Sequence, residues 1–159
     1  MHKDSYLNHL QGWTGYDTGG GCMALMRIYQ RQVVLLTDAS GSAIPETDDQ
    51  TPCLLGLYSR NPDTGEWAEL EDAATDYPSV REALDDLEAM EARFGKLLRP
   101  YTVAGVYGNT YEVFCDHVLA ATVRDALVET VRRRDDCGIA GVFAGHIRDL
   151  SAKENFDDL

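Results

Sequence analysis

The 159-residue chain has little basic charge and no long apolar run. It contains 14 Lys and Arg residues against 27 Asp and Glu residues, which gives a formal net charge of −13. A field of this sign opposes binding to nucleic acid and to anionic membranes, so we expect neither as a direct partner. Apolar runs such as Val33 to Leu36 fall far short of the roughly 20 residues that span a bilayer, and the N-terminus lacks a signal-peptide apolar segment. These absences predict a cytoplasmic protein.

The sequence also lacks the closely spaced pairs of cysteine or histidine that are typical of metal-binding sites. The four cysteines, Cys22, Cys53, Cys115 and Cys137, form no C-x-x-C pair, and the four histidines form no H-x-x-x-H pair. A zinc site needs several such side chains to converge. We therefore expect reduced thiols, no metal and no cofactor.

Glycine, by contrast, is concentrated in one stretch, GWTGYDTGGGCMAL at residues 12–25. Its glycines do not match a phosphate-binding loop, because no Lys-Ser or Lys-Thr follows and the next segment has a strand pattern rather than a helix pattern. The stretch reads as a loop that displays Trp13 and Tyr16. These rings, with Tyr58 and Trp67 nearby in the sequence, are candidate interface anchors, and the alternative is that they fold back onto the core. A second interpretation makes Cys22 a nucleophile, with His9, His117 or His146 as base and Asp17 orienting it.

In the first half, apolar residues alternate with polar ones in several segments, and turn-forming Asp, Ser, Gly and Pro residues separate these segments. This pattern predicts the strands and the helix. Residues 23–30, 32–37, 53–59 and 66–70 read as strands of a small antiparallel sheet. The segment 77–95 predicts an amphipathic helix. Ser79 and Glu82 have capping-box spacing, and Gly95 supplies a stop.

The second half has the pattern strand, strand, helix, strand. The strands are expected at 101–107, 110–121 and 137–147, and the helix at 123–134, with Val123, Leu127, Val128 and Val131 on its apolar face. Pro100 marks the junction. The predicted fold class is therefore α+β: an N-terminal antiparallel sheet with an amphipathic helix in residues 1–98, followed by a ββαβ unit in residues 99–159 that either forms its own domain or shares one core.

Acidic residues are densest between residues 63 and 91, where eleven carboxylates stand against one basic residue, Arg81. Charged residues on the outer side of an amphipathic helix need no function, and a solvated helix face is one interpretation. The other is an acidic surface that occupies a basic groove of a partner. On that hypothesis the partner-binding candidates are Trp13, Tyr16, Asp17, Glu69, Glu71, Asp72, Asp85, Asp86 and Glu88.

Residues 101–147, with YTVAGVYGNTYEVFCDHVLAATVRDALVETV followed by GIAGVFAGHI, resemble small uncharacterised proteins of phages and plasmids. The resemblance implies a mobile-element setting, in which small acidic proteins block host defence complexes. It implies no catalytic residues.

Together these observations predict a non-enzymatic inhibitor of a host nucleic-acid-handling complex, of the anti-CRISPR or anti-restriction type, that binds a basic protein surface as a nucleic-acid mimic. One alternative is a small enzyme or ligand-binding module that uses the Gly-rich stretch with Cys22 and a histidine. Another is a structural or self-assembling protein that uses the exposed edges of its sheets. The oligomeric state stays open.

Overall fold

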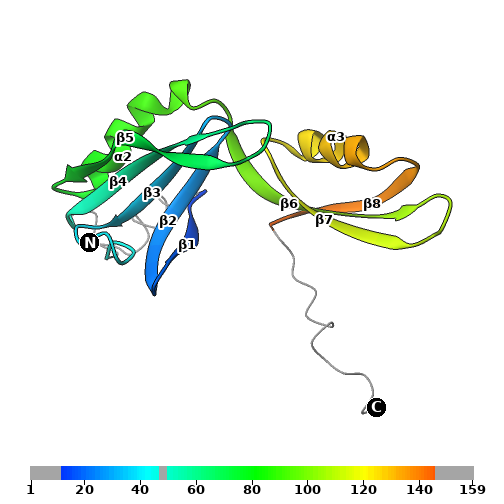
Figure 1. The fold of residues 1–159 in the computed structure, drawn as a ribbon, viewed down its shortest axis with the longest axis horizontal. Coiled ribbons are helices and arrows are strands. Elements are labelled where there is room, and N and C mark those ends of the chain that lie inside the picture. Colours follow the sequence, from blue (N-terminus) through cyan, green and yellow to red (C-terminus); the bar gives the residue numbers. More distant parts are fainter. Residues whose placement is uncertain (1–11, 47–49, 146–159) are drawn as a thin grey trace, which may run out of the picture. The chain divides into compact units, whose positions relative to one another are not determined.

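The computed structural model describes residues 12–46 and 50–145, and it excludes the side chains of residues 70–73. The chain divides into two compact units, Met1–Leu98 and Arg99–Leu159 (Figure 1).

The first unit is built on an antiparallel sheet. Its strands are β1 (Thr14–Gly19), β2 (Cys22–Tyr29), β3 (Gln32–Asp38), β4 (Cys53–Arg60) and β5 (Trp67–Tyr77). They lie in the order β5-β4-β3-β2, and β1 pairs with the outer side of β2. The start of β6 (Leu97–Tyr107) pairs with the other end of β2, where Tyr29 lies opposite Leu97. Apolar and β-branched residues make β2 to β4 good strands, as their alternation predicts.

The Gly-rich stretch is a hairpin rather than a loop. Thr14 to Asp17 pair with Met26 to Met23, and Gly19, Gly20 and Gly21 turn the chain with φ of 99°, 64° and 85°. Left-handed values of this kind favour glycine because a Cβ clashes there. The interpretation of a loop is therefore wrong, and the glycines instead form the tight turn that joins β1 to β2.

One face of this sheet is covered by α2 (Val80–Met90), which continues into a 3₁₀ turn, η1 (Glu91–Arg93). Ser79 caps the helix, since its hydroxyl accepts the backbone N–H of Glu82 at 3.2 Å, as the capping-box spacing predicts. Val80, Ala83 and Leu87 are buried on its inner side. They complete the main core with residues from three strands and the flanking segments: Trp13, Leu25, Tyr29, Val34, Leu36, Cys53, Leu55 and Phe94.

The second unit is a three-stranded antiparallel sheet with one helix. β7 (Val113–Ala120) and β8 (Cys137–Ala144) flank β6, and α3 (Val123–Arg133) connects them. Pro100 lies inside β6, opposite Leu119, and its carbonyl accepts the N–H of Gly145 at 2.8 Å. A proline has a carbonyl to offer but no N–H, so it fits this position.

The apolar face predicted for α3 is mostly solvent-exposed. Ala126 and Thr130 are fully buried against the sheet, whereas Val123, Val128 and Val131 are each about half exposed. Small residues let a helix approach a sheet closely, and Ala126 packs with Val103, Val118 and Ala120. The close fit to the sheet therefore decided the buried face, and helical periodicity alone did not.

The fold class predicted from the sequence is wrong. Within the described residues the chain is mainly antiparallel strand, with two α-helices of 11 residues each. Two segments account for the difference. The Gly-rich stretch forms β1, and β5 extends over 11 residues where a short strand was expected. The described part of the protein is therefore a large antiparallel sheet with little helix.

Candidate interaction surface

The sheet of the first unit has one face that no helix of the described chain covers, and we call it the open face. Successive strand residues point to opposite faces. Leu25, Val34 and Leu55 therefore point toward α2, and their neighbours point away. Ala24, Val33 and Leu35 form a buried cluster on the open face, and Tyr16, Met26, Ile28 and Tyr58 pack against it.

Three aromatic rings meet on this face. Trp67 of β5 lies between Tyr16 of β1 and Tyr58 of β4, with ring centroids 5.6 Å and 5.2 Å away in edge-to-face arrangements. Trp67 is 37% exposed and the two tyrosines are half-buried. We call Tyr16, Tyr58 and Trp67 the aromatic trio. Rings of this kind, apolar with a polar edge, supply much of the binding energy at protein interfaces.

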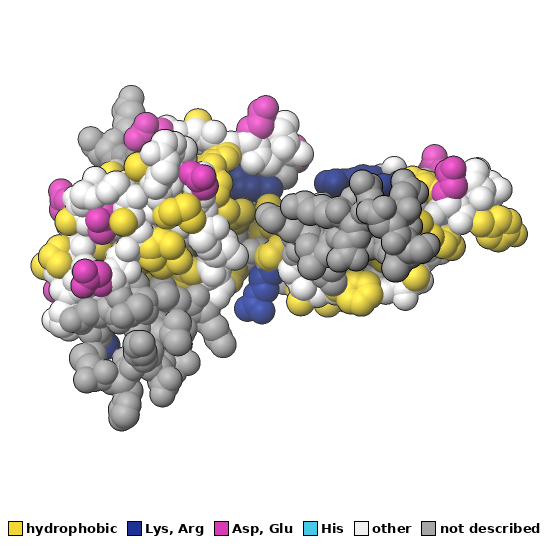
Figure 2. Space-filling model, turned by 90° about the horizontal axis from the view of Figure 1, so that it is seen from below, with side chains coloured by type: hydrophobic (Ala, Val, Ile, Leu, Met, Phe, Trp, Pro, Cys, Tyr) yellow, Lys and Arg dark blue, Asp and Glu magenta, His cyan; other side chains and the backbone are white. Residues whose placement is uncertain are grey.

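Carboxylates share the open face with the aromatic trio, and one of them, Glu69, lies beside it. Glu69 lies opposite Tyr58 in the β4–β5 register, and Asp76 lies opposite Leu54, so both point to the open face. Burial raises the pKa of the Tyr58 hydroxyl, and the charge of Glu69 raises it further. Figure 2, viewed from the side opposite α2, shows hydrophobic side chains gathered on the first unit with acidic side chains around them. The open face thus combines an apolar centre with an acidic border.

A shallow depression adjoins the trio at the end of the β4–β5 hairpin. Ser59, Asn61, Glu66, Trp67 and Ala68 line it. The side chain of Asn61 stabilises the hairpin turn, because its oxygen accepts a hydrogen bond from the backbone N–H of Asp63 at 2.9 Å. The depression therefore extends the polar rim around Trp67.

Of the two aromatic candidates in the Gly-rich stretch, the structure places only Tyr16 on the open face. Trp13 is 9% exposed and belongs to the main core. The guanidinium of Arg27 lies 4.9 Å from the Trp13 ring centroid, a cation–π contact. Trp13 therefore packs against β2 on the face of the sheet that α2 covers. Asp17 lies in the hairpin, where its carboxylate accepts the N–H of Gly19 at 2.8 Å and helps to hold the turn.

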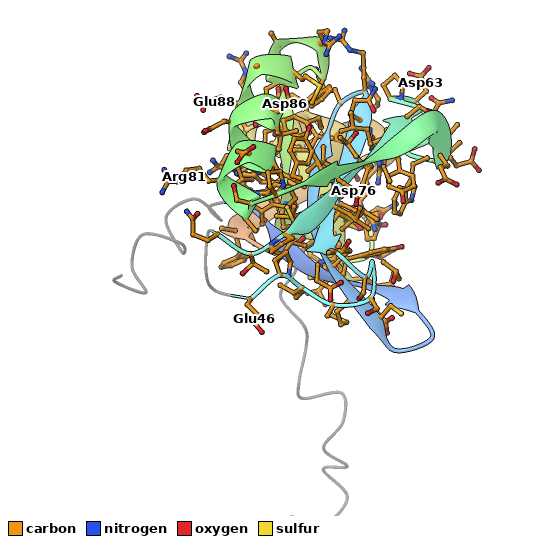
Figure 3. The ribbon with its side chains drawn as sticks, turned by 90° about the vertical axis from the view of Figure 1, so that its left-hand side faces the viewer. Glu46, Asp63, Asp76, Arg81, Asp86 and Glu88 are labelled. Carbon is orange, nitrogen blue, oxygen red and sulfur yellow. The ribbon has the colours of Figure 1, made fainter. Side chains whose placement is uncertain are left out.

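The helix candidates lie on a different side from Tyr16 and Glu69. Asp85, Asp86 and Glu88 project from the exposed side of α2, which packs on the face opposite the open face. Figure 3 shows Asp86 and Glu88 on the helix, Asp76 on the sheet and Asp63 at the far hairpin. Glu71 and Asp72 belong to β5, but their side chains lie outside the described part of the structure. The acidic candidates therefore spread around the first unit instead of forming one patch.

Two carboxylates near α2 have structural partners. Asp86 accepts a hydrogen bond from the Tyr77 hydroxyl, and burial together with this carboxylate raises the pKa of Tyr77 to about 12. Glu91 accepts the Tyr29 hydroxyl and, at 3.1 Å, the guanidinium of Arg27. These contacts tie the helix to the sheet.

The catalytic alternative gains no support from the described residues. Cys22 opens a β-strand, so it lacks the helix N-terminus that often activates a thiol. His117 belongs to the second unit, and His9 and His146 lie outside the described residues. Within residues 12–46 and 50–145, no three His, Cys, Asp or Glu side chains cluster as metal ligands would.

Sequence reasoning offered Tyr58 and Trp67 as candidate interface anchors beside Trp13 and Tyr16, but it missed Met26 and Ile28. The sequence of β2 to β4 contains the signal that was missed, because both faces of these strands are apolar and the sequence predicts one helix, at residues 77–95, in this half of the chain to cover them. Two apolar faces and one covering helix predict one uncovered face.

No family model, no curated protein and no solved structure matches this chain. In the described residues, no helix is both long enough and apolar enough to span a membrane.

Proposed function

We propose that this protein is a non-enzymatic, acidic interaction protein that acts in the cytoplasm and inhibits a host nucleic-acid-handling complex. The target would be a CRISPR effector or a restriction enzyme, consistent with the resemblance of residues 101–147 to phage and plasmid proteins. The observation that carries the proposal is the open face, where the partly exposed aromatic trio lies beside the carboxylate of Glu69, and Asp76 lies further along β5 on the same face.

Such a surface suits a basic protein groove. The aromatic rings supply apolar area that becomes buried on binding, and the carboxylates pair with Lys and Arg side chains that otherwise hold a nucleic-acid backbone. The net charge of −13 adds long-range attraction, which speeds association more than it tightens the final complex. Asp85, Asp86 and Glu88 contribute to that field from the α2 side.

The test is inhibition of purified CRISPR effectors and restriction enzymes by the full chain. DNA cleavage is measured at two salt concentrations. The open-face variants are Trp67→Ala and Glu69→Lys, and the matched control is Glu88→Lys, which makes the same charge change on α2. We expect Trp67→Ala to weaken inhibition at least about tenfold, as for a buried aromatic anchor. Glu88→Lys is expected to cost only about twofold, through the field.

Added salt separates the two contributions. Inhibition by the wild-type chain is expected to weaken as salt rises, because screening removes the attraction of the acidic field. If no nuclease of either class is inhibited, the proposed target is wrong. If Glu88→Lys costs more than Trp67→Ala and Glu69→Lys, the open face is not the binding surface.

A further inference from the structure

The turn between β6 and β7 holds a tyrosine in a backbone conformation that bulky residues disfavour. Tyr111 has a φ of 58°, in the left-handed region that glycine and asparagine adopt more readily. Two backbone hydrogen bonds close this turn. The N–H of Tyr111 donates to the carbonyl of Tyr107 at 2.9 Å, and the N–H of Tyr107 donates to the carbonyl of Glu112 at 3.0 Å. Glycine or asparagine would therefore suit position 111 better than tyrosine.

The side chain of Tyr111 gains little packing that could offset this strain. Tyr111 is 82% exposed, and Val113, two residues further on, is equally exposed. A large aromatic side chain stabilises a fold mainly through the apolar area that it buries. Folding thus does not explain the tyrosine at this position. Residues held in strained backbone conformations are concentrated at binding and catalytic sites.

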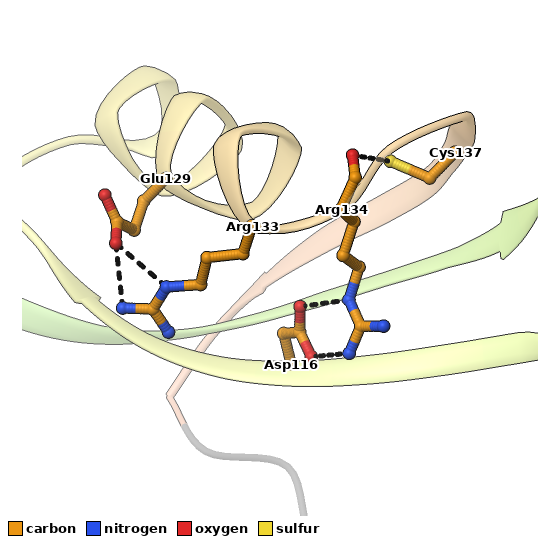
Figure 4. A network of polar contacts seen from close by, with 5 residues as sticks. All are labelled: Asp116, Glu129, Arg133, Arg134 and Cys137. Atoms are coloured by element: carbon orange, nitrogen blue, oxygen red, sulfur yellow. Dashed lines mark hydrogen bonds and ion pairs between the residues drawn. The ribbon is translucent and has the colours of Figure 1, made fainter.

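The base of the turn is rigid. The rings of Tyr107 and Phe114 have centroids 5.4 Å apart, and the guanidinium of Arg134 lies 5.2 Å and 4.4 Å from these two centroids. Figure 4 shows Arg134 reaching from the end of α3 to Asp116, whose carboxylate accepts hydrogen bonds of 2.6 Å and 2.5 Å from it. A side chain presented from a fixed base loses less entropy when it binds. Tyr111 is therefore preorganised for contact with a partner.

The loop from α3 to β8 brings carboxylates to the same end of the second unit. The N–H of Gly108 donates to the carbonyl of Asp136 at 2.8 Å, and a Cβ added to Gly108 would lie 2.7 Å from the Asp136 carboxylate. Asp135, Asp136 and Glu112 are all exposed. Figure 2 shows acidic and hydrophobic side chains together at this end of the second unit. We call residues 108–113 together with Asp135 and Asp136 the acidic tip.

We propose that the acidic tip is a second contact with the nuclease or effector complex, in which Tyr111 enters an apolar protein pocket bordered by Lys and Arg side chains. This second contact rests on the proposed function, which names the partner. The carboxylates of the tip repel phosphate groups, so neither a nucleic acid nor an anionic lipid suits it. Two copies of the chain would bring like charges together at this site. A protein pocket with a cationic border complements both the exposed ring and the carboxylates.

Tyr111→Asn tests this contact, because asparagine adopts a positive φ readily and lacks the ring. We expect the melting temperature of the full chain to stay the same or to rise by a few degrees, since strain is relieved. Inhibition of DNA cleavage is expected to weaken at least about tenfold. A tyrosine that is needed for folding gives the opposite result, a lower melting temperature. Tyr111→Phe retains the ring and is expected to inhibit within about twofold of the wild-type chain.

Two further variants separate the ring from its surroundings. Val123→Ala is the matched control, because it shortens an apolar residue of α3 that is 50% exposed and lies outside the acidic tip. It is expected to leave inhibition unchanged. Glu112→Gln removes one charge of the tip and is expected to weaken inhibition about threefold at low salt and less at high salt.

The outcomes distinguish the second contact from the proposed function. A wild-type chain that inhibits no nuclease overturns the proposed function and the second contact with it. If the wild-type chain inhibits and Tyr111→Asn inhibits equally well, the second contact alone is overturned. A lower melting temperature in Tyr111→Asn, or an equal loss of inhibition in Val123→Ala, also overturns it. Sedimentation velocity tests the remaining occupant, since self-association that depends on Tyr111 would show that the tip contacts a second copy instead.

Discussion

Tyr29 shows how a single hydroxyl in this protein links sheet and helix. Its side chain is 2% exposed, and the hydroxyl donates to Glu91 while Arg27 donates to the same carboxylate at 3.1 Å. The Tyr29 ring also packs against Phe94, with centroids 5.3 Å apart. Burial, followed by the hydrogen bond to Glu91, raises the pKa of Tyr29 to about 12.

Tyr29→Phe is therefore expected to change the alkaline stability of the protein. Because the folded-state pKa lies above the unfolded value near 10, the neutral hydroxyl stabilises the fold below pH 10. That stabilisation is lost as the pH rises to about 12. The wild-type chain should lose on the order of 1–2 kcal/mol of unfolding free energy over this range through Tyr29, and the variant should lose less.

Urea denaturation at several pH values measures this difference. Tyr111→Phe is the control, because it removes the same hydroxyl from a side chain that is 82% exposed. Identical alkaline slopes for Tyr29→Phe and the wild-type chain would contradict the role of Tyr29.

At the scale of elements, the β1–β2 hairpin connects the glycines to the open face. Among the strands that the structure describes, β1 pairs with β2 alone, and the turn between them consists of Gly19, Gly20 and Gly21 at positive φ. An added Cβ at any of these three positions meets no atom within 4 Å. The need for glycine there is thus conformational and not a matter of space.

Replacing Gly20 and Gly21 by alanine should destabilise this hairpin by roughly 1 kcal/mol per residue, since both must keep φ above zero. Hydrogen exchange is expected to show faster opening of β1, with protection of β3 and β4 unchanged. Inhibition should weaken with it, because Tyr16 reaches Trp67 only from a formed β1. Gly138→Ala is a control, as its φ is not positive and the nearest atom to an added Cβ is 3.8 Å away. Unchanged exchange in β1 would show that the turn tolerates alanine.

Over the whole molecule, the excess of carboxylates affects folding and binding with opposite signs. A net charge of −13 makes the folded chain repel itself, and salt screens that repulsion. Salt also screens attraction to a basic partner, so the same ions that strengthen the fold weaken the complex.

Raising NaCl from about 20 to 500 mM is therefore expected to raise the melting temperature of the isolated chain by a few degrees. The measurement is a thermal melt followed by circular dichroism, at one protein concentration throughout. Glu88→Lys, which makes the chain less negative at an exposed site, should show a smaller rise. A melting temperature that falls with salt would mean that ion pairs such as Arg134–Asp116 outweigh the repulsion.

The sequence by itself determined the local features of the molecule. Ser79 begins α2 because a hydroxyl at that position satisfies a helix N–H, and this requires no distant contact. Strands β2 to β4 follow from alternation and β-branched residues, and the acidic field follows from composition alone. Each of these depends on neighbours within a few residues or on a simple sum over the chain.

Only the tertiary structure decided which surfaces of the helices and strands stay exposed to solvent. The sequence could not show that Ala126, and not Val128 or Val131, faces the sheet, because the fit between helix and strands selects the smaller residue. It also left open whether Trp13 and Tyr16 share a surface. β1 sends Tyr16 to the open face, whereas Trp13, just before the strand, packs into the main core. Tyr16 and Trp67 are far apart in the chain. Their rings come into contact only because the pairing of whole strands places both on the same face of the sheet.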